Sequence, residues 1–401
     1  MMCDDEIEIE NHEKYKEINS FPVVLEIEAH HVDSLTYNDF FDKFMVKNIP
    51  VLITGIADRW ECMNWVNTGE NCRINFEYLK KTINVNQDIP IANCSKVYFN
   101  SHEKSEMQFG QFIDYWQTQI QQNERESSNL LYLKDWHLRH NQPDYGFYRT
   151  PIYFASDWLN EYCAEKKADD YRFVYMGPKG TWTPFHADVF SSFSWSTNIV
   201  GTKKWIFFSP HEEDKLRDGL GNLPFDMNNE IYQCRIHERD IRFFEVIQRA
   251  GQTVFVPSGW HHQVWNLEDT ISINHNWFNG CNIHCIWDAL LSKFNAVLRE
   301  IDDCKDMDGF EEHCQLMLKS DFGLDFRMFL DILKTILANR LNILQNNAKL
   351  VLNEAKLGRE HAIYDLNAIH RVLTDFSTKC PLEELQKSSQ NMMIQIDKIV
   401  R

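Results

Sequence analysis

The sequence of 401 residues lacks the features that mark several common classes of protein. It has no uninterrupted apolar run near the roughly 20 residues that a membrane-spanning helix requires, so we expect no association with a membrane. Its formal net charge is -18, and because a phosphate-binding surface needs clustered lysine and arginine, we expect no direct contact with nucleic acid. An acidic surface remains compatible with a basic protein partner.

Cysteines are present, but their spacing does not fit a zinc site or a disulfide framework. The 11 cysteines include no Cys-x-x-Cys pair, and the tightest spacing, from Cys281 to Cys285, has no second pair to complete a tetrahedral site. The odd count and the lack of an apolar secretion signal favour reduced thiols. We therefore predict a cytoplasmic location, with the nucleus as a further compartment.

The N-terminal part of the chain has a charged start followed by alternating helix and strand patterns. Residues 1–20 are rich in charge and poor in apolar periodicity, which predicts a loosely ordered acidic tail. Residues 21–170 are predicted to pack on a central barrel. There, apolar residues at helical spacing in Phe40–Met45 precede the buried strand Val51–Thr54, and Ser156 is predicted to cap a later helix.

The rest of the chain divides into a β region and a helical region. Residues 171–280 consist of short aromatic and β-branched runs separated by turn sequences such as GPKG, RAGQ and PSGW, which is typical of a barrel or double-sheet jelly roll. Residues 281–401 show apolar residues at helical spacing, for example in FRMFLDILKTILANRLNILQ. These C-terminal helices are predicted to cover the barrel, with a homodimer interface as the alternative.

Three His-x-acid sequences are candidates for part of a metal site, about as many as chance placement of 16 histidines and 59 acidic residues produces. Their surroundings distinguish them. His186–Asp188 lies in a strand pattern, where residues i and i+2 point to the same face and can direct two ligands into a barrel together. His211–Glu213 opens a polar helical stretch and is predicted to be solvated, and His31–Asp33 has no turn and strand around it.

A metal site of two histidines and one carboxylate for iron(II) needs a third ligand, and the sequence VFVPSGWHHQVWN supplies a candidate. There a strand ends at Val256, turns, and restarts at the histidine pair His261 and His262. Neighbouring strand residues face opposite sides, so only one of the two histidines can bind the same metal as His186–Asp188.

Polar residues alternate with apolar ones in two of the predicted strands. One face carries Ser194, Ser196 and Asn198 in the first strand and Ser272, Asn274 and Asn276 in the second. A barrel interior lined by serine and asparagine would hold a polar ligand, and the alternative is the solvent face of an exposed sheet.

The combination of TPFHAD, GTKKW and PSGWHHQVWNLEDTISIN resembles the JmjC family of iron(II)- and 2-oxoglutarate-dependent oxygenases, from PVLITG to about Trp277. The resemblance implies a double-stranded β-helix, the cupin-like jelly roll of that family. It implies a metal triad of His186, Asp188 and His262, which leaves His261 as a bystander. Fe(II) is thus the expected metal, with 2-oxoglutarate and O2 as cosubstrates.

The same resemblance assigns the cosubstrate contacts. Lys203, the first lysine after Gly201-Thr202, is expected to meet the distal carboxylate of 2-oxoglutarate as a point charge, with Thr183 and Asn274 as hydrogen-bond partners. Lys204 is then expected to face outward.

The longer run HADVFSSFSWSTNIVGTKKW resembles a member of the family that hydroxylates a lysine of the eukaryotic translation termination release factor. The resemblance implies that this release factor is the protein substrate. A histone lysine demethylase of the same fold and a non-catalytic binding module are the alternatives. Chromatin demethylases usually carry reader or zinc modules, which are not apparent here, and the intact triad argues against a binding module.

Overall fold

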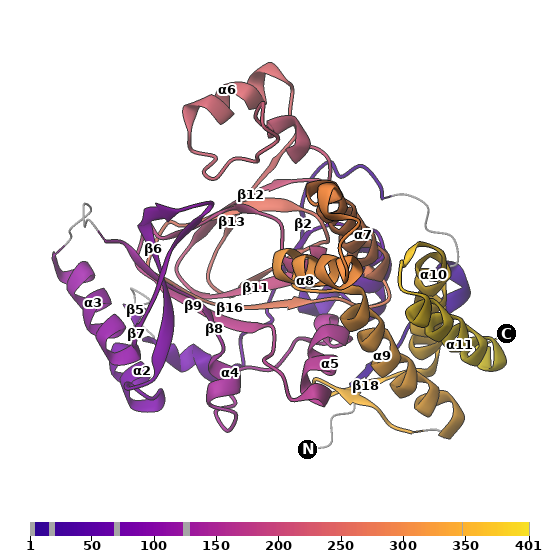
Figure 1. Ribbon diagram of the computed structural model, residues 1–401. Coiled ribbons are helices and arrows are strands. Elements are labelled where there is room, and N and C mark those ends of the chain that lie inside the picture. Colours follow the sequence, from indigo (N-terminus) through magenta and orange to yellow (C-terminus); the bar gives the residue numbers. More distant parts are fainter. Residues whose placement is uncertain (1–4, 16–20, 68–72, 123–128, 347, 401) are drawn as a thin grey trace.

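The computed structural model describes residues 5–15, 21–67, 73–122, 129–346 and 348–400 (Figure 1). Two β-sheets face each other and form the predicted jelly roll, so the fold class is confirmed. The larger sheet has nine strands in the order β2 (Glu28–His31), β3 (Val51–Thr54), β14 (Gln252–Val256), β11 (Phe193–Val200), β16 (Thr270–Trp277), β9 (Arg172–Gly177), β8 (Leu131–Trp136), β6 (Asp88–Tyr98) and β7 (Ser101–Gln108). The smaller sheet has the order β10 (Trp182–His186), β15 (His261–Asn266), β12 (Lys203–Phe208) and β13 (Phe244–Gln248).

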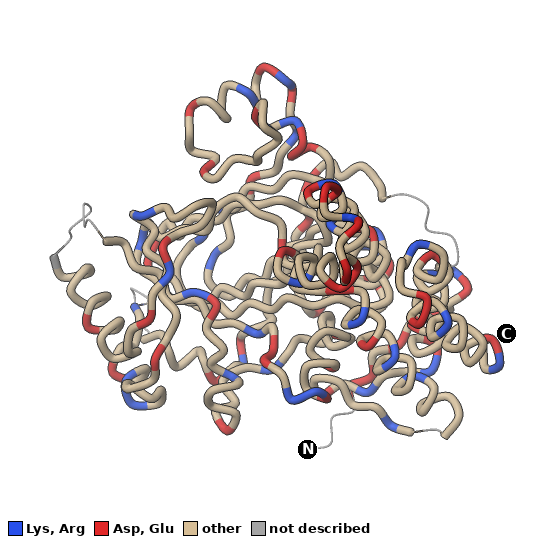
Figure 2. Tube along the Cα trace, in the orientation of Figure 1, with Lys and Arg blue, Asp and Glu red and all other residues tan. Residues whose placement is uncertain are grey.

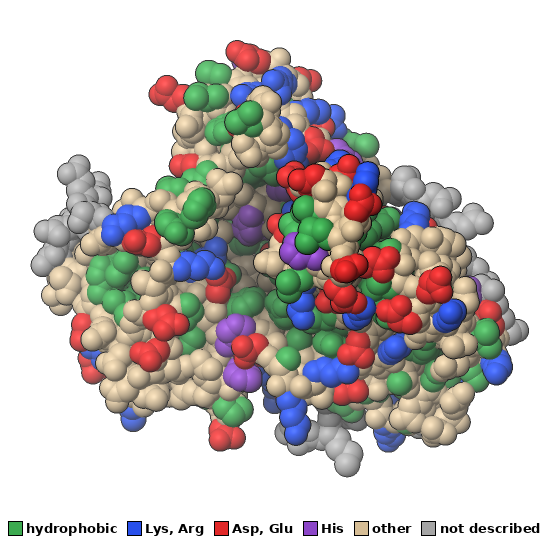
Figure 3. All heavy atoms as spheres, in the orientation of Figure 1, with side chains coloured by type: hydrophobic (Ala, Val, Ile, Leu, Met, Phe, Trp, Pro, Cys, Tyr) green, Lys and Arg blue, Asp and Glu red, His purple; other side chains and the backbone are tan. Residues whose placement is uncertain are grey.

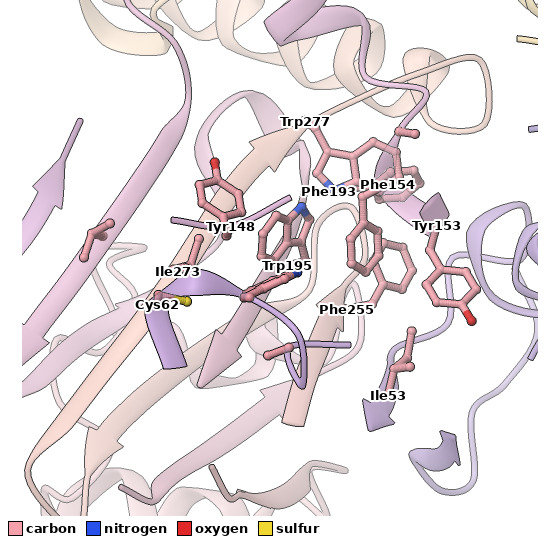
Figure 4. Packing of buried hydrophobic residues seen from close by; sticks show 14 of the residues in the cluster. Ile53, Cys62, Tyr148, Tyr153, Phe154, Phe193, Trp195, Phe255, Ile273 and Trp277 are labelled. Carbon is pink, nitrogen blue, oxygen red and sulfur yellow. The ribbon is translucent and has the colours of Figure 1, made fainter. Parts of the chain in front are cut away.

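The alternation predicted for β11 separates the main hydrophobic core from the interior of the barrel. Phe193 and Trp195 belong to the core, where Phe154 stacks on the Trp195 indole at a centroid distance of 5.4 Å (Figure 4). On the other face of the same strand, Ser194 and Ser196 line the pocket between the two sheets. The strand therefore holds a rigid aromatic layer behind a polar cavity.

The N-terminal region extends the larger sheet and packs on its outer side. Its helices are α1 (Tyr37–Phe40), continued by a π-helical turn at Phe41–Met45, then α2 (Phe76–Thr82), α3 (Phe109–Gln122), α4 (Leu138–Asn141) and α5 (Trp158–Lys166). The predicted cap at Ser156 is wrong by one residue. The Asp157 carboxylate caps α5 instead, because it accepts a hydrogen bond from the backbone N–H of Asn160 at 2.9 Å.

The described part of the predicted tail is ordered, which corrects the prediction for residues 5–15. The short strand β1 (Glu6–Ile7) pairs in parallel with β18 (Ala355–Leu357) near the C-terminus, and β18 also pairs with β17 (Val351–Leu352). Ile7 and Ile9 are fully buried. The apolar residues of this segment, rather than a periodic pattern, therefore indicate that it packs against the rest of the protein. Residues 1–4 and 16–20 lie outside the described residues.

The predicted β region also contains a helical insertion. Residues 209–243 leave the barrel between β12 and β13, carry α6 (Glu230–Glu238), and form the projection at the top of Figure 1. The side of the smaller sheet that faces the insertion is apolar, with Phe185, Ile206 and Phe208 packed on Leu216 and Met227. The insertion therefore covers the outside of the sheet that supplies two of the predicted metal ligands.

The C-terminal region is helical, as predicted, apart from β17 and β18. Its helices are α7 (Ile283–Glu300), α8 (Phe310–Phe322), α9 (Phe326–Asn346), α10 (Arg359–Lys379) and α11 (Glu383–Val400). Their apolar faces form a second core with α5. At its edge the fully buried Arg340 guanidinium bridges Glu161 of α5, at 2.8 Å, and Asp365 of α10, at 2.6 Å, which fixes the helices to the barrel region. No helix in the described ranges is long and apolar enough to cross a bilayer.

Candidate metal and cosubstrate site

The pairing of β10 with β15 brings two predicted metal ligands together. His186 lies opposite His262 in this antiparallel pair, and the centroids of the two imidazole rings are 4.4 Å apart. Asp188 follows the end of β10. One ligand atom from each of these three residues lies within 4.8 Å of the others, and the three form the only such group of His, Cys, Asp or Glu side chains among the described residues.

Backbone carbonyls orient both histidines. Nδ1 of His186 donates to the carbonyl oxygen of Pro184 at 2.7 Å, and Nδ1 of His262 donates to that of Trp260 at 3.0 Å. The partner at Nδ1 assigns the tautomer, so that in both rings Nε2 keeps its lone pair for a metal. Burial, together with the neighbouring His262, holds the pKa of His186 well below its usual range, which keeps this ring neutral and competent to coordinate.

Two polar side chains hold the carboxylate of Asp188. Ser194 Oγ donates to Oδ2 at 2.7 Å, and Asn276 Nδ2 donates to Oδ1 at 2.9 Å. A carboxylate oxygen has two lone pairs, so each can accept one hydrogen bond and still face a cation. Hydrogen bonds of this kind around ligating groups orient them for the metal, so the donor set and its supports fit an iron(II) site.

The pocket beside the triad contains a buried cation. Lys203 is 2% exposed, and its Nζ donates to the hydroxyl of Tyr132 at 3.3 Å. No acidic side chain among the described residues pairs with Lys203, and burial, with a smaller effect of Lys134, lowers its pKa to about 7. A buried ammonium without a counterion is expected to bind an anionic ligand such as a carboxylate.

The structure places the other predicted cosubstrate contacts in the same pocket. Thr183 and Asn274 both line it, together with the triad and Lys203. Lys204 points to the opposite side of β12, where its Nζ pairs with Glu245 at 2.7 Å on the surface. Lys203 therefore faces the pocket and Lys204 faces outward, which is the strand register that the resemblance implied.

The remaining histidine candidates lie away from the pocket. His261 faces the insertion, where its Nδ1 is 3.4 Å from Glu213 Oε1 and its ring lies beside Phe185. His31 ends β2, and His211 is exposed in the insertion. The prediction that His211–Glu213 is solvated is wrong for Glu213, which is buried because the insertion folds back onto the smaller sheet.

Sequence reasoning missed two tyrosines of the pocket. Tyr132 and Tyr175 come from β8 and β9 of the larger sheet, and Lys134 lies over the Tyr175 ring at 5.8 Å from its centroid. The sequence around Tyr132, NLLYLKDW, has no motif that marks a site. Only the pairing of β8 with β9 brings this tyrosine to Lys203.

Comparisons with known proteins agree with this geometry. Residues 173–277 match the model of the JmjC domain, described as a hydroxylase. The chain is 44% identical to the 2-oxoglutarate and iron-dependent oxygenase JMJD4 homolog of Drosophila melanogaster, over 92% of this chain and 93% of the relative. It is 42% identical to 2-oxoglutarate and iron-dependent oxygenase JMJD4 of Homo sapiens, over 85% of this chain and 82% of the relative. The chain belongs to the JmjC family and, within it, to the JMJD4 group of 2-oxoglutarate and iron-dependent oxygenases.

Proposed function

We propose that this protein is an Fe(II)- and 2-oxoglutarate-dependent dioxygenase that hydroxylates a lysine side chain of the eukaryotic translation termination release factor. The observation that carries the reaction class is the convergence of His186, Asp188 and His262 on one point beside the uncompensated cation Lys203. The substrate is supported by the resemblance of HADVFSSFSWSTNIVGTKKW to a lysyl hydroxylase of that factor.

Different residues of the pocket would bind the iron and the 2-oxoglutarate. His186, Asp188 and His262 would hold the iron, and Lys203, with Tyr132, would hold the distal carboxylate of 2-oxoglutarate. Thr183 and Asn274 would add hydrogen bonds to that carboxylate. When bound, the iron and 2-oxoglutarate supply the oxidation: one atom of O2 enters the substrate C–H bond, and the other enters succinate as CO2 leaves.

The protein contributes orientation and a fixed charge distribution. Ser194 and Asn276 keep the Asp188 carboxylate directed at the metal position, and the carbonyls of Pro184 and Trp260 keep both imidazoles in the coordinating tautomer. Because these partners are already in place, little reorganisation accompanies the reaction. The donors Ser194 and Asn276 and the two acceptor carbonyls are all neutral. They therefore add no charge to that of the Asp188 carboxylate.

Demethylation is the second candidate. A relative in Arabidopsis thaliana, 36% identical over 81% of this chain and 73% of its own length, is named arginine-specific demethylase JMJ20. The same site would serve a histone lysine demethylase. The acidic net charge of -18 supports a basic protein substrate in either case.

We further propose a cytoplasmic or nuclear location and no direct nucleic-acid partner. The nine cysteines that the structure describes form no disulfide, which fits a reducing compartment. A homodimer through the C-terminal helices stays a proposal that the oligomeric state in solution would test, since much of their apolar surface packs within one chain.

Incubation of the purified enzyme with release factor, trimethylated histone lysine peptides and methylated arginine peptides, side by side, tests the substrate. Oxygen incorporation and methyl loss are both followed by mass spectrometry. We expect an oxygen atom on a lysine of the release factor and no methyl loss. Methyl loss without oxygenated release factor would assign the protein to the demethylases.

A further inference from the structure

An apolar groove lies between α7 and α8, outside the site described above. It has about 230 Å³ of open space and is lined mainly by the side chains of Phe294, Leu298, Phe310, Cys314 and Pro381. Leu298 and Phe310 are partly exposed, so the groove opens to the surface. A cavity of roughly 150 Å³ accepts a benzene ring, so this groove has room for a large apolar side chain.

The wall of the groove contains a hydrogen-bond donor without an acceptor. Gln315 is 97% buried, since its exposed fraction is 3%. Its Oε1 accepts from the backbone N–H of Phe326 at 3.1 Å, which fixes the orientation of the amide, and its Nε2 has no partner. Because this nitrogen is itself buried, the unpaired donor is costly to the wall of the groove.

Carboxylates crowd the turn that joins the two helices. Residues 300–312 contain seven acidic side chains and one lysine, and all seven acidic residues are exposed. Asp302 and Glu312 have ion-pair partners, whereas Glu300, Asp303, Asp306, Asp308 and Glu311 have none among the residues that the structure describes. Figure 2 shows acidic residues along α7 and α8, and Figure 3 shows acidic side chains gathered on the same face, beside a hollow between these helices and the sheet region.

The groove and the metal site lie at opposite ends of α8. Phe322, at the C-terminal end of the helix, packs at 5.9 Å between ring centroids from Phe190, two residues beyond Asp188. Phe310 begins the helix at the groove. The 13 residues of α8 span about 20 Å, so one protein could occupy both places.

We infer that the α7–α8 groove, with its acidic turn, docks a basic amphipathic segment of the protein substrate. An apolar side chain enters the groove, and lysine or arginine side chains meet the unpaired carboxylates. The inference rests on the proposed function insofar as the segment belongs to the substrate. Docking in this groove would affect binding of the protein substrate and would leave the oxidation chemistry unchanged.

Fluorescence anisotropy tests the docking surface directly. The probe is a fluorescein-labelled amphipathic peptide of about 18 residues made of leucine and lysine, with a leucine and glutamate peptide for comparison. We compare the wild-type protein with the double variant Asp308→Lys/Glu311→Lys and with Leu298→Lys. The matched control is Asp58→Lys/Asp144→Lys, which changes the charge equally at two exposed carboxylates of the N-terminal region. Thermal unfolding checks that each variant is folded.

We expect the double variant and Leu298→Lys to weaken binding of the basic peptide at least tenfold, and the control to change it less than threefold. Equal weakening in the control would mean that net charge alone attracts the peptide, and would overturn the proposal, as would unchanged binding in the two groove variants.

Steady-state kinetics with release factor then tests whether the docked segment belongs to the substrate. The double variant should raise KM about tenfold with kcat unchanged, and should leave 2-oxoglutarate turnover without protein substrate unchanged. An unchanged KM alongside lost peptide binding would overturn the assignment to the substrate. If the wild-type enzyme does not hydroxylate release factor, the proposed substrate fails, while the anisotropy result still decides the docking surface.

Discussion

His186 and His262 face each other across neighbouring antiparallel strands, with their ring centroids 4.4 Å apart. Each ring donates from Nδ1 to the carbonyl of the residue two positions before it. The shared geometry leaves both Nε2 atoms available on the same side, next to Asp188. The metal site is thus a property of the strand pairing as well as of the three side chains.

The histidine pair offers a direct test of the ligand assignment. His262→Ala removes a predicted ligand, so we expect loss of stoichiometric iron binding and of 2-oxoglutarate turnover. His261→Ala should retain most of both, because His261 faces the insertion and Glu213. Metal content after reconstitution and succinate formation measure the two effects, and the reverse pattern would show that the assigned ligand is wrong.

The supports of Asp188 should also matter for the metal. Asn276→Ala removes the donor to Oδ1, and loss of such a partner typically weakens metal affinity by about ten- to a hundredfold. Ser272→Ala, at a buried serine of the same strand that does not contact Asp188, is the matched control. Titration with iron(II) under anaerobic conditions measures both. Equal iron(II) affinities for the Asn276→Ala and Ser272→Ala variants would show that Asn276 does not support the metal site.

Lys203 and Lys204 form a second matched pair. A charge-assisted contact in a partly dehydrated pocket contributes about 1.5 to 3 kcal/mol, so Lys203→Ala should raise the Kd for 2-oxoglutarate roughly ten- to a hundredfold. Lys204→Ala should have little effect, because that side chain pairs with Glu245 on the surface. Calorimetric titration with 2-oxoglutarate is the measurement. A larger effect at Lys204 would refute the assignment of Lys203.

The affinity for 2-oxoglutarate should depend on pH through Lys203. Burial lowers the pKa of the free ammonium to about 7, and a bound carboxylate would raise it, so binding above pH 7 takes up a proton. The Kd should therefore be nearly constant below pH 7 and rise by up to roughly tenfold per unit above it. Lys203→Arg stays charged and should flatten this rise. Identical profiles for the two proteins would exclude Lys203 as the titrating group.

The fold could be predicted from local patterns and the metal and cosubstrate residues from the resemblance to the JmjC family, whereas what was missed depends on distant contacts. The period of two in β12 places Lys203 and Lys204 on opposite faces, and the resemblance assigned Lys203 to the inner one. The same alternation exposes the serines of β11 to the cavity. Tyr132 reaches Lys203 only through the pairing of β8 with β9. Glu213 is buried by an insertion whose polar sequence gives no sign of its folding back. Such contacts are set by tertiary structure rather than by the residues nearby.

The most direct test of the proposed activity is tandem mass spectrometry of release factor after reaction with isotopically labelled dioxygen. The wild-type enzyme, with iron(II) and 2-oxoglutarate, should place one labelled oxygen atom on a lysine side chain, and His262→Ala should place none. Absence of labelled lysine with the wild-type enzyme, despite 2-oxoglutarate turnover, would contradict the proposed lysyl hydroxylation of this factor.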